Sequence, residues 1–336
     1  MKQEIREIPD ILENLISHSE NGIKTAAENI GAHHVPYVTT IARGSSDHAA
    51  TYLKYIIELY AGVPVASIGP SISSIYGAKL DMSGALSLSI SQSGQSPDIV
   101  HMTEMARKGN ARTIAITNDV TSPLANVCDH ALDIKASNER SVAATKTFVS
   151  SVVTGLLFVA YWKNNRELLE AIKKLPEQVN DVFQTNWDIL LDGLNGHSSI
   201  YCLGRGPAWA IANEAALKFK ETCQIHAESY SSAEVMHGPK SIIGQEFPVI
   251  AFAARDASEK SMIQSVQMLG EQGGQCYITS EKVCSAEKLA FVSSGHPATD
   301  PLLLIISFYQ FIEKLARHRG LNPDEPPHLK KVTETI

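Results

Sequence analysis

The sequence lacks the features of several protein classes. Lysine and arginine form no basic run, and the 336 residues carry a formal net charge of -7. Because nucleic-acid binding depends on basic side chains that neutralise phosphates, both observations argue against a nucleic-acid partner. An anionic ligand would therefore need a local site made of backbone amides, hydroxyls and a few lysines.

Cysteine is also scarce, and its spacing has no chemical pattern. The five cysteines are Cys128, Cys202, Cys223, Cys276 and Cys284. They include no C-x-x-C pair, which argues against a disulfide framework and a zinc site, so we expect free thiols, no metal and no cofactor. No apolar run reaches the roughly 18–20 residues of a membrane span, and residues 1–20 lack the apolar segment of a signal peptide. A cytoplasmic protein without a membrane partner is expected.

Short apolar segments alternate with longer helical patterns along the chain. This rhythm is typical of βαβ units, in which helices cover both faces of a parallel sheet. The expected strands are 35–42, 85–91, 111–117 and 131–134, followed by 198–203, 248–253, 275–279 and 289–293. The fold class expected is α/β with two tandem, doubly wound modules, and a chain of this length accommodates two domains.

The two halves begin alike. Residues 39–46 and 201–208 each combine a strand end, an Arg-Gly pair and a helix start, so that Arg43 matches Arg205 and Gly44 matches Gly206. This pattern indicates duplication of one module, and chance similarity over so few residues is the alternative. The predicted organisation is an N-terminal helical segment (1–30), two modules (31–180 and 181–320), a helical connector within 156–187 and a tail (321–336). Three prolines prevent a continuous helix in the tail, which is either disordered or docked near an anion.

A polar turn follows the expected strand 85–91. Residues 91–96 read Ser-Gln-Ser-Gly-Gln-Ser and precede a predicted helix that runs from about 98 to 108. Helix N-termini at the carboxyl ends of parallel strands bind anions, and Gly94 would let the backbone approach a phosphate closely. A polar turn with an N-cap serine is the alternative. A second serine-bearing turn at 44–46 favours a shared phosphate site.

Residues 213–221 place ionisable side chains on one face of a predicted helix. Glu214, Lys218 and Glu221 fall at i, i+4 and i+7, whereas Lys220 points elsewhere. A histidine, His237, follows sixteen residues after this segment. This set of side chains is suited to proton transfer, although a solvated helix face held by ion pairs would have the same spacing.

Six ordered motifs together resemble the sugar isomerase (SIS) family. They are Gly44-Ser45-Ser46, Ser91–Ser96, Val142–Lys146, Glu214–Glu221, His237-Gly238-Pro239 and Leu329–Thr333. The resemblance is to the isomerase half of glutamine–fructose-6-phosphate aminotransferase and its stand-alone relatives, and it covers essentially the whole chain. It implies two tandem SIS domains and a sugar-phosphate substrate.

The resemblance also implies roles for single residues. The implied phosphate ligands are Ser46, Ser91, Gln92, Ser93 and Ser96. The expected supporting residues of the site are Gly44, Val142 and Glu214, the last as a carboxylate beside Lys218 and Glu221. Glu221 matches the base that moves a proton between C1 and C2, Lys218 is the lysine beside it, and His237 assists ring opening. Lys331 matches the tail lysine that interacts with the open-chain carbonyl. In the family the histidine comes from the neighbouring subunit, which implies a homodimer with shared active sites.

Departures from the family pattern bear on the substrate and the reaction. Ala144 stands where the aminotransferase has a serine, and Gln95 replaces an acidic residue, so substrate preference stays open. The aminotransferase also has an upstream amidohydrolase domain, whereas this chain starts at the isomerase half. We therefore expect a glucosamine-6-phosphate deaminase that forms fructose 6-phosphate and ammonium. A fructosamine-6-phosphate deglycase, a galactosamine-6-phosphate deaminase-isomerase and a non-catalytic sugar-phosphate sensor are the alternatives.

Overall fold

The computed structural model describes residues 1–282 and 285–331 and divides into two compact units. Unit 1 comprises Met1–Pro9, Arg140–Thr145 and Lys174–Leu329, and unit 2 comprises Asp10–Glu139, Lys146–Lys173 and Lys330–Ile336. Cys284 and the end of the predicted tail, 332–336, lie outside the described residues. The domain divisions predicted at 30/31, 180/181 and 320/321 stay predictions.

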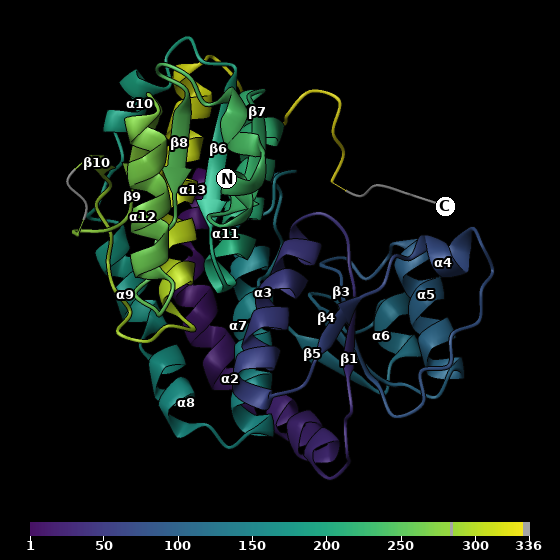
Figure 1. The fold of residues 1–336 in the computed structure, drawn as a ribbon. Coiled ribbons are helices and arrows are strands. Elements are labelled where there is room, and N and C mark those ends of the chain that lie inside the picture. The colour runs from purple at the N-terminus through teal and green to yellow at the C-terminus, as the bar shows by residue number, and fades with distance from the viewer. Residues whose placement is uncertain (283–284, 332–336) are drawn as a thin grey trace. The chain divides into compact units, whose positions relative to one another are not determined.

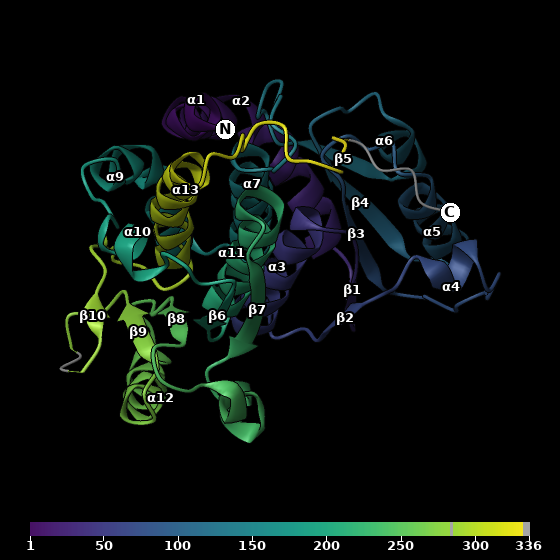
Figure 2. The ribbon, with the colours of Figure 1, turned by 90° about the horizontal axis from the view of Figure 1, so that it is seen from above.

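Unit 2 is built on a parallel sheet (Figure 1), whose strands follow the order β2-β1-β3-β4-β5, as Figure 2 shows. Its strands are β1 (Val38–Ile41), β2 (Val65–Ser67), β3 (Leu86–Ile90), β4 (Arg112–Thr117) and β5 (His130–Asp133). Its helices are α2 (Ile8–Gly31), which begins in unit 1, α3 (Ser45–Ala61), α4 (Ser71–Ser74), α5 (Pro97–Lys108), α6 (Pro123–Val127), α7 (Lys146–Trp162) and α8 (Arg166–Lys173). Helices α5 and α6 cover one face of this sheet, and α3 and α7 cover the other (Figure 2).

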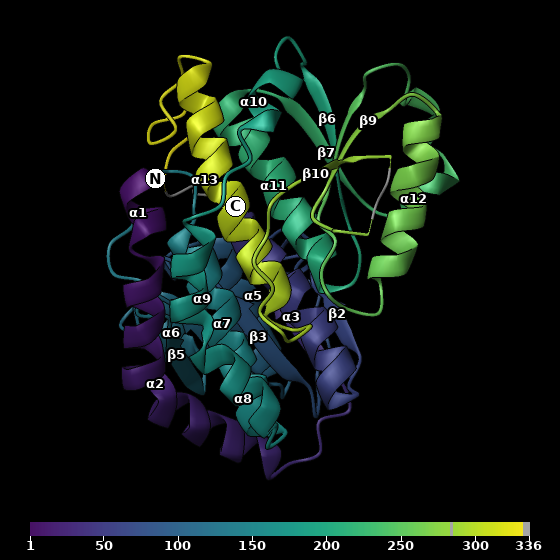
Figure 3. The ribbon, with the colours of Figure 1, turned by 90° about the vertical axis from the view of Figure 1, so that its left-hand side faces the viewer.

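Unit 1 is built on a second parallel sheet, in the order β10-β9-β8-β6-β7. Its strands are β6 (Ser199–Gly204), β7 (His226–Ser231), β8 (Pro248–Ala251), β9 (Gln275–Ile278) and β10 (Glu287–Lys288). Its helices are α1 (Lys2–Arg6), α9 (Leu175–Val182), α10 (Ile189–Gly193), α11 (Pro207–Cys223), α12 (Glu259–Glu271) and α13 (Asp300–His318). Two 3-10 helices, Glu234–His237 and Pro239–Ile242, follow β7. Helix α12 covers one face, and α11 and α13 cover the other (Figures 2 and 3). The predicted α/β class with two parallel sheets is thus confirmed.

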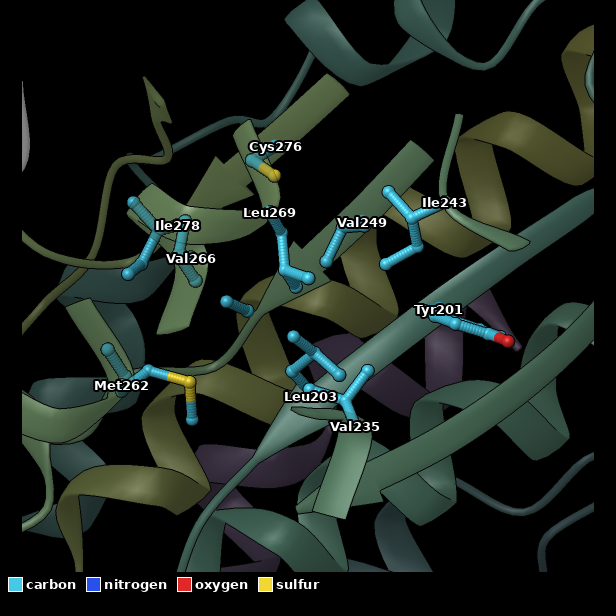
Figure 4. Close-up of a cluster of buried hydrophobic side chains, with 12 residues drawn as sticks. Tyr201, Leu203, Val235, Ile243, Val249, Met262, Val266, Leu269, Cys276 and Ile278 are labelled. Carbon is cyan, nitrogen blue, oxygen red and sulfur yellow. The ribbon is translucent and has the colours of Figure 1, made fainter. Parts of the chain in front are cut away.

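A buried core joins α12 to its sheet (Figure 4). Met262, Val266 and Leu269 of α12 pack against strand residues such as Leu203 and Val249, and all five side chains are fully buried. Burial of such a side chain stabilises the fold by roughly 1.5–3 kcal/mol. This core fixes the strand ends and loops at the carboxyl edge of the sheet.

The two sheets have the same topology, which supports duplication over chance similarity. Read from opposite edges, β2-β1-β3-β4-β5 and β7-β6-β8-β9-β10 follow the same order along the chain. Gly44 and Gly206 also share a backbone conformation, with φ/ψ of 55°/-135° and 59°/-139°, and each precedes the first helix of its module.

One predicted strand was wrong, and two predicted helical segments are divided into shorter helices. The segment 289–293 is not a strand: Asp300 instead accepts hydrogen bonds from Ser293 and Ser294. The segment 1–30 is helical but consists of two helices, because the ring of Pro9 would clash with the carbonyl of Ile5 in one continuous helix. The segment 156–187 is helical in parts of α7, α8 and α9, and Trp187 lies beyond them.

Three edge strands, β2, β7 and β10, were not predicted, whereas the edge strand β5 was. β2 and β10 are three and two residues long, and β7 reads His-Ala-Glu-Ser-Tyr-Ser, with Ala227 its single fully buried residue. Strands this short or this polar have no apolar run that would mark them in the sequence.

The described residues include four of the five cysteines. Cys128, Cys202, Cys223 and Cys276 are free thiols. Within residues 1–282 and 285–331, no helix combines the length and the apolar character needed to cross a membrane. The same ranges contain no group of three His, Cys, Asp or Glu side chains that could hold a metal ion.

The packing of α7 against α3 generates a stability prediction. A Cβ added to Gly155 of α7 would lie 2.3 Å from Leu53 Cδ1, and Leu53 is 1% exposed. Gly155→Ala should therefore lower the free energy of unfolding by about 1–3 kcal/mol through overpacking. Gly22→Ala in α2, with nothing within 4 Å, should instead raise it by up to about 1 kcal/mol. Urea unfolding of both variants checks this contrast, and a stable Gly155→Ala protein would contradict it.

Candidate functional site

The predicted ionisable face lies on α11, whose ends are set by its sequence. Gly206 has positive φ before the first turn, Pro207 occupies the first helical position, and Gln224 ends the helix in the left-handed conformation. Between these ends, alanines and Phe219 bury most of the helix against the sheet and α13. Buried positions extend over the ionisable face as well.

Glu214, Lys218 and Glu221 form one ion-paired cluster, as their spacing predicts. Lys218 Nζ lies 3.0 Å from Glu214 Oε1 and 2.7 Å from Glu221 Oε2. The hydroxyl of Tyr309 in α13 donates to Glu214 Oε1 at 3.2 Å. The side chains of Glu214 and Lys218 have no exposed surface, whereas 20% of Glu221 is exposed. The interpretation as a solvated helix face is therefore wrong, and Lys220, which is exposed, lies outside the cluster.

The carboxylates keep the buried lysine charged. Burial by itself lowers the pKa of Lys218, but the negative charges of Glu214 and Glu221 and their hydrogen bonds outweigh it, so the pKa lies above its ordinary value. Lys218 is thus an ammonium throughout the physiological pH range. It holds one oxygen of Glu221 while part of that carboxylate stays accessible.

The predicted phosphate turn, Ser91–Ser96, joins β3 to α5 in unit 2. Gly94 has φ of 62°, its N–H donates to Ser91 Oγ at 3.2 Å, and its carbonyl accepts from Leu124 N at 3.1 Å. A Cβ at Gly94 would fall 2.1 Å from Ser122 Oγ. Only glycine fits here, so the backbone of the turn sits directly on the start of α6.

The turn leaves hydroxyl groups at the N-terminus of α5. Ser96 is the N-cap residue, but its side chain makes no capping hydrogen bond, and it is half-buried like Gln92 and Ser93. Ser46 is half-buried in the first turn of α3. Arg43 Nε lies 2.7 Å from Asp98 Oδ2, an ion pair that links the start of the α3 turn to the first turn of α5. The structure thus ties both serine turns together, with two helix N-termini available to an anion.

The second module carries a carboxylate at the corresponding helix start. Glu259 is the first residue of α12, is 7% exposed and accepts a hydrogen bond from Ser280 Oγ at 2.9 Å. Lys282 and Arg255 also pair with it. Nothing in the sequence had marked Glu259.

The remaining predicted residues have separate surroundings. His237 ends its 3-10 helix and is exposed, and among the described residues no hydrogen bond joins it to the α11 cluster. The backbone N–H of Val142 donates to the carbonyl of Asp324 at 3.2 Å, so this part of the tail is docked. Lys331 Nζ lies 2.8 Å from Glu139 Oε2.

Two residues of these clusters were missed by sequence reasoning. Glu139 has no exposed side-chain surface and also accepts a hydrogen bond from Thr147 Oγ1 at 2.7 Å. Tyr309 lies 95 residues from its partner Glu214 in the sequence. A carboxylate three residues before Val142 is the single sequence signal for Glu139, and Tyr309 lies in an apolar helix with no signal at all.

Comparisons with known proteins place this fold and these residues in one family. A family model described as the SIS domain matches residues 35–161 and 193–293, more than half of the chain. The chain belongs to the SIS domain family. A glutamine–fructose-6-phosphate aminotransferase (isomerizing) from Sulfurisphaera tokodaii is 32% identical over 301 residues, covering 88% of this chain and 49% of that protein. The chain spans about half the length of the curated relatives it matches.

Solved structures give the same result. A Silicibacter pomeroyi protein that is provisionally described as a phosphosugar isomerase is 47% identical, with a TM-score of 0.93 over 96% of this chain and 99% of that one. The C-terminal domain of glucosamine-fructose-6-phosphate aminotransferase from Francisella tularensis is 26% identical, with a TM-score of 0.84 over 97% of this chain and 98% of that one. The predicted resemblance is confirmed.

Removing the buried ammonium should destabilise unit 1. Lys218→Met leaves two carboxylates close together in a buried site, so we expect a loss of about 3–5 kcal/mol at pH 7. In the unmodified protein the raised pKa of Lys218 also sets a pH window: its contribution to stability is complete below about pH 10.5 and is lost as pH rises further. Chemical denaturation across pH measures both effects. Lys220→Met, an exposed position of the same helix, is the control and should be neutral.

The phosphate turn can be tested by filling the space at Gly94. Gly94→Ala should weaken binding of a sugar phosphate by at least about tenfold, because the turn must move off Ser122. Gly77→Ala is matched in backbone strain, with φ of 60°, but meets nothing within 4 Å. Isothermal titration with a hexose 6-phosphate should separate the two variants. Equal affinities in both would remove the assigned role of the turn.

Proposed function

We propose that this chain is a glucosamine-6-phosphate deaminase, which converts glucosamine 6-phosphate to fructose 6-phosphate and ammonium by an aldose–ketose isomerisation. The observation that carries the proposal is the geometry of Glu221, a partly exposed carboxylate held 2.7 Å from a fully buried ammonium. A general base needs an accessible oxygen and a fixed orientation, and this pair supplies both.

The names of the relatives support one class of substrate for this proposal. Several curated relatives are named as glutamine–fructose-6-phosphate aminotransferases (isomerizing), a name that combines an amino group, a ketose phosphate and an isomerisation. Transferred to this chain as a proposal, the name favours an amino-sugar phosphate. The serine turn of unit 2 would bind the phosphate, and Glu221 would move the proton.

The proposed reaction needs no external oxidant or reductant, because C2 is oxidised while C1 is reduced. His237 assists opening of the sugar ring, Glu221 removes the proton from C2 of the aldose, and the same carboxylic acid returns it to C1. The aldehyde oxygen gains a proton as the amine loses one, which leaves a ketimine at C2. Water adds to the ketimine, and nitrogen leaves as ammonia, which takes up a proton. Lys218 keeps Glu221 ionised before the first step and stabilises the negative charge that develops on the enediol-like intermediate.

The other predicted roles belong to the same proposal. Lys331, which pairs with Glu139 in this structure, would contact the open-chain carbonyl. The exposure of His237 is compatible with a role in the site of a neighbouring subunit, so the proposal includes a homodimer with shared active sites. It also includes a cytoplasmic location, as expected from the sequence.

The decisive assay incubates the purified protein with glucosamine 6-phosphate and detects fructose 6-phosphate and ammonium in coupled reactions. Glu221→Gln should lower turnover at least about a hundredfold without changing the fold, because the amide cannot accept the proton. Glu167→Gln, an exposed position in α8, is the matched control and should keep full activity.

The outcomes separate the candidate functions. Turnover of fructosamine 6-phosphate or galactosamine 6-phosphate in place of glucosamine 6-phosphate would favour the related enzymes. Binding of sugar phosphates with no turnover of any of them would favour a sensor. Near wild-type turnover in Glu221→Gln would remove the base from the proposal.

A further inference from the structure

The loop that carries His237 is held at its first half by the core of unit 1. We call residues 234–243 the histidine loop; it contains the two 3-10 helices. Val235 has no exposed surface and packs in the core shown in Figure 4. Ile243, at the other end of the loop, is buried in the same core. Both ends of the loop are therefore fixed by apolar packing.

Tyr201 makes a side-chain hydrogen bond to the histidine loop. It lies on β6, is 2% exposed, and its hydroxyl donates to the carbonyl of Pro239 at 3.1 Å. Figure 4 shows this hydroxyl pointing away from the other labelled side chains. The accepting carbonyl belongs to the residue two positions after His237. A buried hydroxyl on a central strand thus reaches the middle of the histidine loop.

The ring of Tyr201 is itself held from two sides. Tyr230 packs edge-on at 5.1 Å between ring centroids, and Phe247 packs edge-on at 4.9 Å. Edge-to-face pairs of this kind contribute beyond simple burial. Burial and the neighbouring charge of Glu228 raise the pKa of Tyr201, so its hydroxyl remains a donor across the working pH range. The donor is fixed in position and in protonation state.

A second clamp holds the later half of the loop. Gln272 Nε2 donates to the carbonyl of Lys240 and to the carbonyl of Ile243, both at 2.8 Å. With Tyr201, it fixes three carbonyl groups on the C-terminal side of His237. The imidazole of His237 is exposed, and in residues 1–282 and 285–331 no hydrogen bond or ion pair engages it.

We propose that Tyr201 is a positioning residue for the reaction, acting through the Pro239 carbonyl to present the imidazole of His237 in a fixed orientation outside its own unit. The inference rests on the role of His237 in the proposed function. An exposed imidazole on a mobile loop would sample many orientations, whereas ring opening requires one that places a nitrogen next to the sugar oxygen. The hydroxyl of Tyr201 limits that freedom.

The test uses Tyr201→Phe, which keeps the ring packing and removes only the hydroxyl. Turnover of glucosamine 6-phosphate should fall about two- to tenfold, the effect of one neutral hydrogen bond. KM should change less than twofold, because the phosphate turn is untouched. Amide hydrogen exchange should accelerate in residues 234–243 and stay unchanged in the strands of unit 1. Tyr277→Phe, which removes the hydroxyl of another buried strand tyrosine that lies outside this aromatic cluster, should leave both measurements unchanged.

A double substitution distinguishes positioning from a general structural role. If Tyr201 acts through His237, Tyr201→Phe should cause no further loss of turnover in a His237→Asn background. An additive loss, or unchanged exchange in the histidine loop, would overturn the inference. The exchange measurement needs no substrate, so it judges the Tyr201 contact even if the protein proves inactive toward amino-sugar phosphates, an outcome that would count against the proposed function instead.

Discussion

The fully buried ammonium of Lys218 is the constraint on which the ionisable cluster of unit 1 depends. A fully buried charge must be paired with a charge of opposite sign. Glu214 and Glu221 pair with Lys218 from the same helix, and Tyr309 of α13 donates a hydrogen bond to Glu214. Apolar residues would stabilise such a position at least as well. The ion pair is therefore better explained by what it does for Glu221: it holds a carboxylate in one orientation while leaving part of it accessible.

The two α/β modules share a backbone framework but differ in the side chains at their helix starts. Both modules place a glycine of nearly identical backbone conformation after the first strand and keep the same strand order. Both modules place a carboxylate in the first turn of the next helix and pair it with a basic side chain: Asp98 with Arg43 in the first module, and Glu259 with Lys282 in the second. They differ in their hydroxyl groups, because Ser280 donates to Glu259 whereas the side chain of Ser96 makes no capping hydrogen bond. The framework is common, and the chemistry differs through a few loop residues.

The sequence was informative where a physical signal is local. Central strands are buried on both faces and appear as apolar runs, and helical spacing was sufficient to put Glu214, Lys218 and Glu221 on one face. Burial of that face was not predictable, because it depends on α13, and Tyr309 is 95 residues from Glu214. The contact of Lys331 with Glu139 spans 192 residues and had no signal in composition or period. The edge strands β2, β7 and β10 were missed because they are too short or too polar to leave an apolar run.

The close packing of Gly94 against Ser122 has a thermodynamic consequence. The turn is already immobilised by the hydrogen bond from Leu124 and by contact with α6, so little of its conformational entropy remains to be lost. For the proposed phosphate site, the ordering cost would be met during folding of unit 2 and not during binding. Affinity and fold stability would then be linked in this unit, and a substitution that loosens α6 would weaken binding from a position that never touches the ligand.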